Sequence, residues 1–200
     1  MRNFPLILLL IPLPTFGQTP KVEVSLRIGL GSLRVFGSNY ADDGTNVGIS
    51  VETRVHPRLG LEFEIDRMLN LHPRPVPCGL SVTCTGSGVE GTRSAFHFSG
   101  NLLYYFRTSA GVEPYVVGGL GSLRSVRAHA ITFVGPTEGR IVQQPNENDS
   151  GVSIGFGGGV RVPVGNRFTV RLEFRLYDSS IRSRSNLGLI LAGVRLGYHW

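Results

Sequence analysis

The final eight residues, 193–200, place the strongest constraint on what this chain can fold into. Their side chains alternate between an apolar set and a polar or small set: Val194, Leu196, Tyr198 and Trp200 against Gly193, Arg195, Gly197 and His199. A strand points alternate side chains to opposite faces, so this segment predicts a strand with one wholly apolar face. Aromatic rings favour the boundary between lipid and water. The pattern therefore predicts the closing strand of a barrel whose outer face meets lipid.

The N-terminal segment predicts export. Arg2 precedes a short apolar run from Phe4 to Leu13, and small residues lie around the Gly17–Gln18 bond, which is typical of a secretory signal peptide and its cleavage site. The run is too short and too rich in proline to cross a membrane as a helix. We expect residues 1–17 to be the signal peptide and residues 18–200 to form one outer-membrane β-barrel domain.

Composition excludes several other classes. Charged residues make up 17% of the chain and the mean hydropathy is +0.07, as expected where lipid-facing apolar residues alternate with polar ones. Basic residues outnumber acidic ones by 20 to 14, but they are spread singly and without interleaved aromatic residues, so we expect no nucleic-acid partner. No histidine pair at metal-ligand spacing accompanies the two cysteines, and we expect no metal and no cofactor.

Period-two alternation predicts eight strands, each near the length that a tilted strand needs to cross a bilayer. They cover residues 22–30, 47–55, 59–66, 95–106, 113–121, 152–162, 168–176 and 190–200, and glycines blur the phase of the fifth. Long connections alternate with short turns along the chain, which is typical of outer-membrane barrels. The predicted fold is all-β, a closed antiparallel eight-stranded transmembrane β-barrel. A soluble barrel of the lipocalin type is disfavoured because the apolar phase is bulky throughout and ends in aromatic residues.

Aromatic residues gather at the short-turn end of these strands. We expect them to form a girdle at the periplasmic boundary of the membrane: Phe106, Tyr115, Phe168, Tyr198 and Trp200.

Three segments, Val112–Gly121, Gly155–Val160 and Arg171–Tyr177, resemble the OmpA/OmpX-type outer-membrane β-barrel domain family. The resemblance covers nearly all of residues 18–200, and it implies residence in the cell outer membrane. It also implies a C-terminal insertion signal, here Tyr198 and Trp200, that is read by the outer-membrane assembly machinery. The family places glycine five residues before the final aromatic residue, and Arg195 stands at that position in this chain.

The inward phase of the predicted barrel is rich in charge. Eleven residues form the expected lumen charge network: Glu23, Arg27, Glu52, Arg54, Glu62, Glu64, Arg161, Arg171, Glu173, Arg175 and Arg195. An eight-stranded barrel is just wide enough inside for side chains, and charges buried there must pair. Two roles follow: a salt-bridge plug that closes the lumen, which we favour, or a narrow pore in which the pairs exchange partners.

A possible enzyme site lies on the fourth predicted strand. His97 and Ser99 have the His-x-Ser spacing that resembles outer-membrane lipid A deacylases, in which histidine activates a serine nucleophile, and Glu113 is the candidate acid. Both residues fall on the polar, inward phase, whereas the deacylase pair faces lipid. A hydrogen-bonding role in the lumen is therefore favoured for His97, and also for His199.

Two features fall in the long connections. Arg124, Arg127, Arg140, Arg182 and Arg184 would lie beyond the outer leaflet, where they either bind lipopolysaccharide phosphate or belong to ordinary solvated loops. The spacing of Cys78 and Cys84 in an oxidising compartment predicts a local disulfide.

These patterns together predict a monomeric, non-enzymatic outer-membrane protein. Its barrel anchors surface loops that serve an envelope-structural or surface-interaction role, and its expected partners are outer-membrane lipid, including lipopolysaccharide, and the assembly machinery. A narrow channel for small solutes and a lipid A deacylase that uses His97 and Ser99 are the alternatives.

Overall fold

The computed structural model of the protein describes residues 22–35, 41–69, 71, 74–76, 88–106, 111–134, 139–143, 147–181 and 186–200. The predicted signal peptide, both cysteines, Arg182 and Arg184 lie outside these ranges. So do the side chains of Arg127 and Arg140, whose backbones are described.

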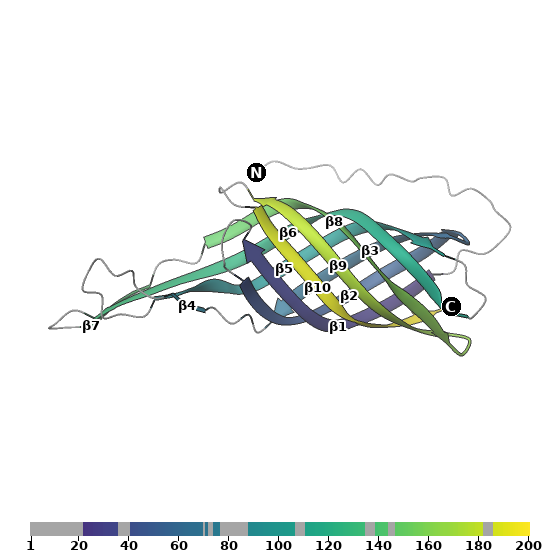
Figure 1. Ribbon diagram of the computed structural model, residues 1–200, viewed down its shortest axis with the longest axis horizontal. Coiled ribbons are helices and arrows are strands. Elements are labelled where there is room, and N and C mark those ends of the chain that lie inside the picture. Colours follow the sequence, from purple (N-terminus) through teal and green to yellow (C-terminus); the bar gives the residue numbers. More distant parts are fainter. Residues whose placement is uncertain are drawn as a thin grey trace, which may run out of the picture.

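The described residues form ten strands of one antiparallel sheet (Figure 1). Their bounds are β1 Val22–Val35, β2 Ala41–His56, β3 Leu59–Leu69, β4 Arg74–Val76, β5 Gly88–Tyr105, β6 Glu113–Val134, β7 Gly139–Gln143, β8 Glu147–Val164, β9 Phe168–Ile181 and β10 Asn186–His199. Eight of them close into a barrel, because β1 pairs with β10 from Glu23 opposite His199 to Val35 opposite Leu187, and β5 pairs with β6. This confirms the predicted closed, eight-stranded, antiparallel barrel.

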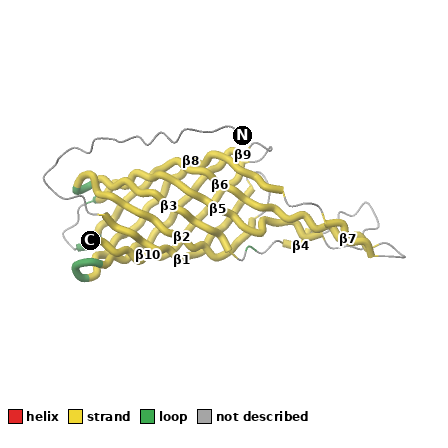
Figure 2. The backbone as a smooth tube through the Cα atoms, turned by 180° about the vertical axis from the view of Figure 1, so that it is seen from behind, coloured by secondary structure: helices red, strands yellow, loops and turns green. Residues whose placement is uncertain are grey.

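At the end of the barrel away from the C-terminus, the strands are longer than predicted. β6 runs for 22 residues, and its far end pairs with β5 on one side and β7 on the other. The short strand β4 pairs with the far end of β5. Together these segments form a ribbon that projects beyond the barrel, as Figures 1 and 2 show from opposite sides. Alternation of apolar residues did not reveal this ribbon, because a segment beyond the barrel neither lines the lumen nor meets lipid.

The two faces of the barrel wall have opposite chemistry. Large apolar side chains stand on the outside with much of their surface exposed, for example Phe63 at 74% and Leu172 at 60%. The inside carries most of the buried charged and polar residues. Such an inside-out arrangement is stable where lipid replaces water around the wall. In the described part of the chain, no helix is long and apolar enough to cross a membrane.

The short-turn end carries most of the expected aromatic girdle. Phe106, Phe168, Tyr198 and Trp200 are exposed there, and the rings of Phe168 and Tyr198 are 5.5 Å apart. The prediction for Tyr115 was wrong: it is 2% exposed and points into the lumen. Glycines follow Tyr115 in β6 and have no side chains that show which residues face inward. The alternation of apolar residues therefore could not predict on which side of the wall Tyr115 lies.

Candidate functional site

The lumen is the candidate functional site, and charge fills its middle. The structure places all eleven residues of the expected network on the inner face of the wall and joins them through ion pairs, which also include Asp66 of β3. Most of the acids come from β2 and β3, whereas three of the arginines come from β9 and β10 on the other side of β1. The central layer therefore consists of acidic side chains that meet basic ones across the lumen.

Glu173 of β9 is a shared acceptor in this layer. Its carboxylate accepts from Arg27 at 2.8 Å, from Arg195 Nε at 2.5 Å and from Arg175 at 3.1 Å. The Tyr115 hydroxyl adds a fourth contact at 2.9 Å. A buried carboxylate with this many donors is stabilised by both charge and hydrogen bonding.

Arg195 is the matching donor on β10. Besides Glu173, its guanidinium reaches Glu62 at 2.8 Å and Glu64 at 2.6 Å, and it donates to the Ser50 hydroxyl at 2.7 Å. These contacts explain why a charged residue stands where the OmpA/OmpX-type family has glycine. The side chain of Arg195 points inward and links the last strand to β2, β3 and β9.

The remaining central arginines bind in the same manner. Arg171 contacts Glu23 at 2.5 Å and also binds Glu52. Arg175 contacts Glu62 at 2.9 Å and also binds Glu64. Arg27 contacts Glu64 at 2.7 Å and also binds Asp66. Each of these arginines binds acidic residues of other strands. The central layer therefore links opposite sides of the barrel wall.

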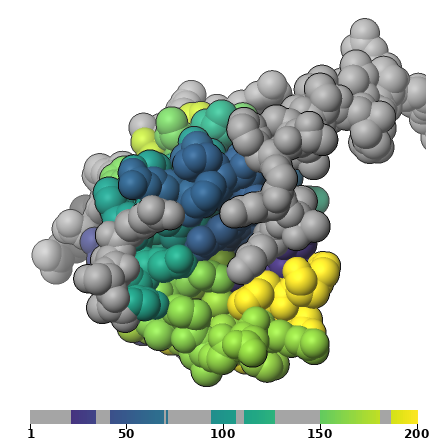
Figure 3. All heavy atoms as spheres, turned by 90° about the vertical axis from the view of Figure 1, so that its right-hand side faces the viewer, coloured from purple at the N-terminus to yellow at the C-terminus, as the bar shows by residue number. Residues whose placement is uncertain are grey.

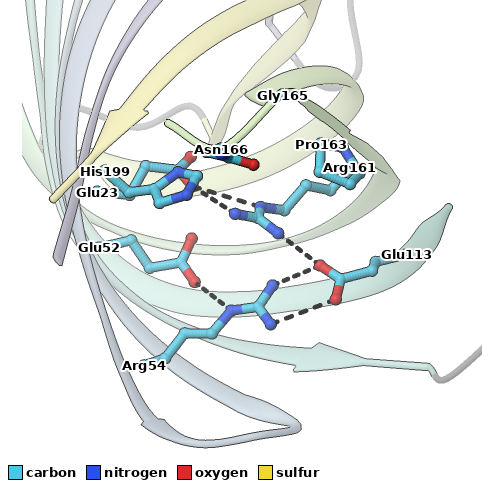
Figure 4. Close-up of a pocket in the computed structure, with 9 residues that line it drawn as sticks. All are labelled: Glu23, Glu52, Arg54, Glu113, Arg161, Pro163, Gly165, Asn166 and His199. Carbon is cyan, nitrogen blue, oxygen red and sulfur yellow. Dashed lines mark hydrogen bonds and ion pairs between the residues drawn. The ribbon is translucent and has the colours of Figure 1, made fainter. Parts of the chain in front are cut away.

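A hollow of about 350 Å³ opens at the short-turn end of the lumen (Figure 4). Arg54 and Arg161 both bind Glu113 there, at 2.7 and 2.6 Å, and Arg161 continues to Glu23 at 2.9 Å. Figure 3 views the molecule from this end, with the turn between β8 and β9 in green and the C-terminus in yellow. Glu113 is 33% exposed, so these pairs are weaker and more exchangeable than those of the central layer.

The other end of the lumen is largely apolar, which the sequence did not predict. Nine buried residues form this outer layer: Leu33, Met68, Leu71, Ala95, Leu123, Tyr177, Leu187, Leu189 and Leu191. Most of them belong to the parts of the strands that extend beyond the predicted ranges. The lumen is therefore polar at its centre, whereas at this end apolar side chains surround a few buried polar ones, Asp42, Ser125 and Ser179.

Glycines on the inner face of β8 make room for large side chains of neighbouring strands. A Cβ added at Gly155 would lie 2.1 Å from the ring of Tyr177, and one at Gly159 would lie 2.8 Å from the hydroxyl of Tyr115. At these glycines the inner face of β8 has no side chains of its own, and side chains of β6 and β9 cover it. The glycine-rich motif of β8 serves close packing inside the lumen.

The structure confirms the favoured role of His97, a buried hydrogen-bonding residue of the lumen, and does not assemble the alternative enzyme site. His97 Nε2 lies 3.1 Å from the hydroxyl of Ser153, whereas Ser99 accepts from Asn101 at 3.1 Å. His97 Nδ1 lies 3.9 Å from Asp66. Glu113, the candidate acid of that alternative, is bound to arginines at the mouth of the lumen. The serine–histidine contact is buried, with His97 beside the ring of Tyr177, and it serves the polar packing of the lumen.

Several lumen residues escaped sequence reasoning. Tyr105 donates to both oxygens of Glu52 at 2.8 Å, and Asn101 donates to Glu62 at 3.1 Å. Asp66, Asn101 and Tyr105 lie on the inward phase of their strands, which was the available signal. His199 lines the hollow at the short-turn end. No group of three or more His, Cys, Asp or Glu side chains in the described residues is suited to hold a metal ion.

Solved structures with this fold come from outer membranes. A major outer membrane protein from Thermus thermophilus has a TM-score of 0.54 at 11% identity, with 92% of this chain and 100% of that chain covered. The attachment invasion locus protein Ail of Yersinia pestis, in complex with the heparin analogue sucrose octasulfate, gives 0.52 at 12% identity, with the same coverage. Neisserial surface protein A gives 0.50 at 16% identity, covering 88% of this chain and 96% of that one. These likenesses show the fold.

No curated protein has a significantly similar sequence. The sequence pattern of the outer membrane protein beta-barrel domain family matches residues 5–199, almost the whole chain. Together with the apolar exterior and the closed strand order, this match makes the chain a member of the outer membrane protein beta-barrel domain family and places it in the bacterial outer membrane.

Proposed function

We propose that this protein is a non-enzymatic membrane anchor whose lumen is sealed and whose long connections act at the cell surface. The observation that carries the proposal is that two different layers fill the lumen in series. The central layer is a network of buried ion pairs, and the outer layer is largely apolar. To pass through the lumen, water and ions would have to break ion pairs in the central layer and then cross the largely apolar outer layer. Each layer therefore blocks the lumen independently of the other.

Single-channel recording in planar bilayers tests the seal. We expect no discrete openings from the wild-type protein, nor from Arg195→Ala or Leu191→Ala alone, because each single change leaves the other layer in place. The double variant Arg195→Ala/Leu191→Ala should leak. Discrete wild-type openings of constant size would contradict the seal and favour the alternative, a narrow channel for small solutes.

The projecting ribbon supports the surface role. β5 and β6 continue past the barrel and are flanked by β4 and β7. The chain therefore forms paired strands beyond the barrel, where a simple membrane anchor needs only loops. Long connections of outer-membrane barrels lie on the extracellular side. An epitope inserted between Val134 and Gly139 should therefore be labelled by antibody on intact cells. An epitope inserted after Gly165, in the turn between β8 and β9, is the matched control and should be labelled only after permeabilisation; the reverse result would sink the proposed orientation.

The absence of catalysis can be tested directly as well. The His97–Ser153 contact is buried, and a serine nucleophile needs access to its substrate. We expect no release of fatty acid from lipid A by the refolded wild-type protein. Release that disappears in Ser153→Ala or in Ser99→Ala would overturn the non-enzymatic assignment and name the nucleophile.

A further inference from the structure

A row of side chains on the outer wall pairs two arginines with an aromatic ring. Arg67 of β3 lies directly opposite Phe96 of β5, and Phe96 lies directly opposite Arg124 of β6. All three are exposed on the lipid-facing side of the wall. Arg67 and Arg124 are separated by two strand spacings, about 10 Å.

No side chain that the structure describes neutralises either guanidinium. The other cross-strand neighbour of Arg67 is Val47, and that of Arg124 is Ser150, so no carboxylate stands opposite either arginine. Within the described residues, neither side chain has a hydrogen bond or an ion pair. Two positive charges with no partner among the described side chains, on an otherwise apolar wall, are suited to bind an external anion.

The position of the row along the barrel identifies its surroundings. Tyr104 of the short-turn end and Phe96 are eight residues apart on β5, which is about 26 Å along a strand and about 20 Å along the barrel axis at the usual tilt. The apolar band of an outer-membrane barrel is about 25 Å tall. The arginines therefore lie at the outer boundary of the lipid, at the level of headgroups, with Phe98 and Ile65 exposed below them toward the acyl chains.

We propose that Arg67, Phe96 and Arg124 form a binding site for a phosphorylated glycolipid of the outer leaflet. The guanidinium groups bind headgroup phosphate in bidentate fashion, and the acyl chains lie along Phe96, Phe98 and Ile65. Charge at the headgroup level combined with an apolar surface just beneath it suits an anchored lipid rather than a free anion. The site goes beyond the proposed function, which concerns the lumen and the ribbon, and it depends only on the orientation of the barrel.

Native mass spectrometry of the refolded mature protein tests the site, with bisphosphorylated lipid A as the probe. We expect the wild type to retain the lipid, and Arg67→Gln/Arg124→Gln to lower the apparent affinity about ten-fold, with each single change giving about three-fold. Arg67→Lys/Arg124→Lys should retain part of the affinity, because charge remains and the bidentate fork is lost.

The matched control is Arg58→Gln/Arg167→Gln, which removes two exposed arginines at the opposite end, where each lies 3.5 Å from a tyrosine hydroxyl. This variant should bind lipid A as the wild type does. Equal affinity of the Arg67→Gln/Arg124→Gln variant and the wild type, equal binding of lipid A stripped of its phosphates, or equal competition by phosphatidylglycerol would each overturn the site. Electrophoretic mobility without heating shows whether each variant is folded, so a loss of lipid affinity in a folded variant reports on the site. Single-channel recordings test the sealed lumen separately, and the Arg67→Gln/Arg124→Gln variant should not change them.

Discussion

Arg195 Nε donates to Glu173 Oε1 at 2.5 Å inside the barrel, and the two residues lie on adjacent strands, diagonal to each other rather than directly opposite. Arg195 is 1% exposed and Glu173 is also buried. The pair connects the last strand of the barrel to a carboxylate that three arginines share. It also explains why a charged residue is tolerated near the C-terminus of a lipid-facing strand.

Removal of the shared acceptor should destabilise the barrel strongly. Glu173→Gln leaves Arg27, Arg175 and Arg195 with one fewer charged partner each, and breaking a buried pair in this way costs about 3–5 kcal/mol. Urea unfolding from lipid vesicles measures the loss. Glu113→Gln at the exposed mouth is the control and should cost about 1 kcal/mol or less. Equal losses of unfolding free energy in the two variants would show that the central ion pairs stabilise the barrel no more than the exposed ones do.

The lipid-facing side of the wall should reject charge in the middle of the membrane. Leu172→Arg should lower the free energy of unfolding by about 2–4 kcal/mol or prevent insertion, because residue 172 stands outside β9 at mid-strand. Phe168→Arg, four residues nearer the short-turn end on the same face, should cost about 1 kcal/mol or less. Folding into vesicles gives both values, and a similar cost for the two would be inconsistent with the assigned lipid boundary.

Two glycines that lie close together on neighbouring strands should differ sharply in tolerance. Gly155→Ala places a methyl group 2.1 Å from the ring of Tyr177 and should cost about 1–3 kcal/mol through overpacking. Gly118→Ala, on the outer face of β6, has its nearest atom at 3.8 Å and should be neutral or slightly stabilising. The same vesicle unfolding assay decides this, and a tolerant Gly155→Ala would mean that Tyr177 does not fill the bare wall.

The predicted disulfide should be peripheral to the barrel. A bridge between Cys78 and Cys84 would close a short ring and stabilise its own segment by about 2–3 kcal/mol, whereas the closed strand ladder holds the barrel. Cys78→Ser/Cys84→Ser should still insert, with faster proteolysis in the segment around residue 80. Intact mass before and after reduction shows whether the native protein is two hydrogens lighter. Two free thiols in protein isolated from membranes would refute the bridge.

The sequence by itself determined the barrel and its outer face. Each lipid-facing strand must alternate with period two, and a run such as Phe168 to Leu176 shows both faces plainly; the short turns were located for the same reason. The inward position of residues such as Glu52 and Arg195 followed directly, because a one-residue shift in register would place these charges in lipid.

Only the tertiary structure decided which inward residues meet. The contact of His97 with Ser153 rather than Ser99, and the gathering of Arg27, Arg175 and Arg195 around Glu173, depend on strands that are far apart in the chain. The inward turn of Tyr115 depends on how a glycine-rich strand packs against β8, where alternation carries no signal. The apolar outer layer was hidden likewise, since apolar residues inside the barrel obey the same period as those outside. Periodicity fixes the side of the wall on which a side chain stands, whereas closure of the barrel fixes its partners.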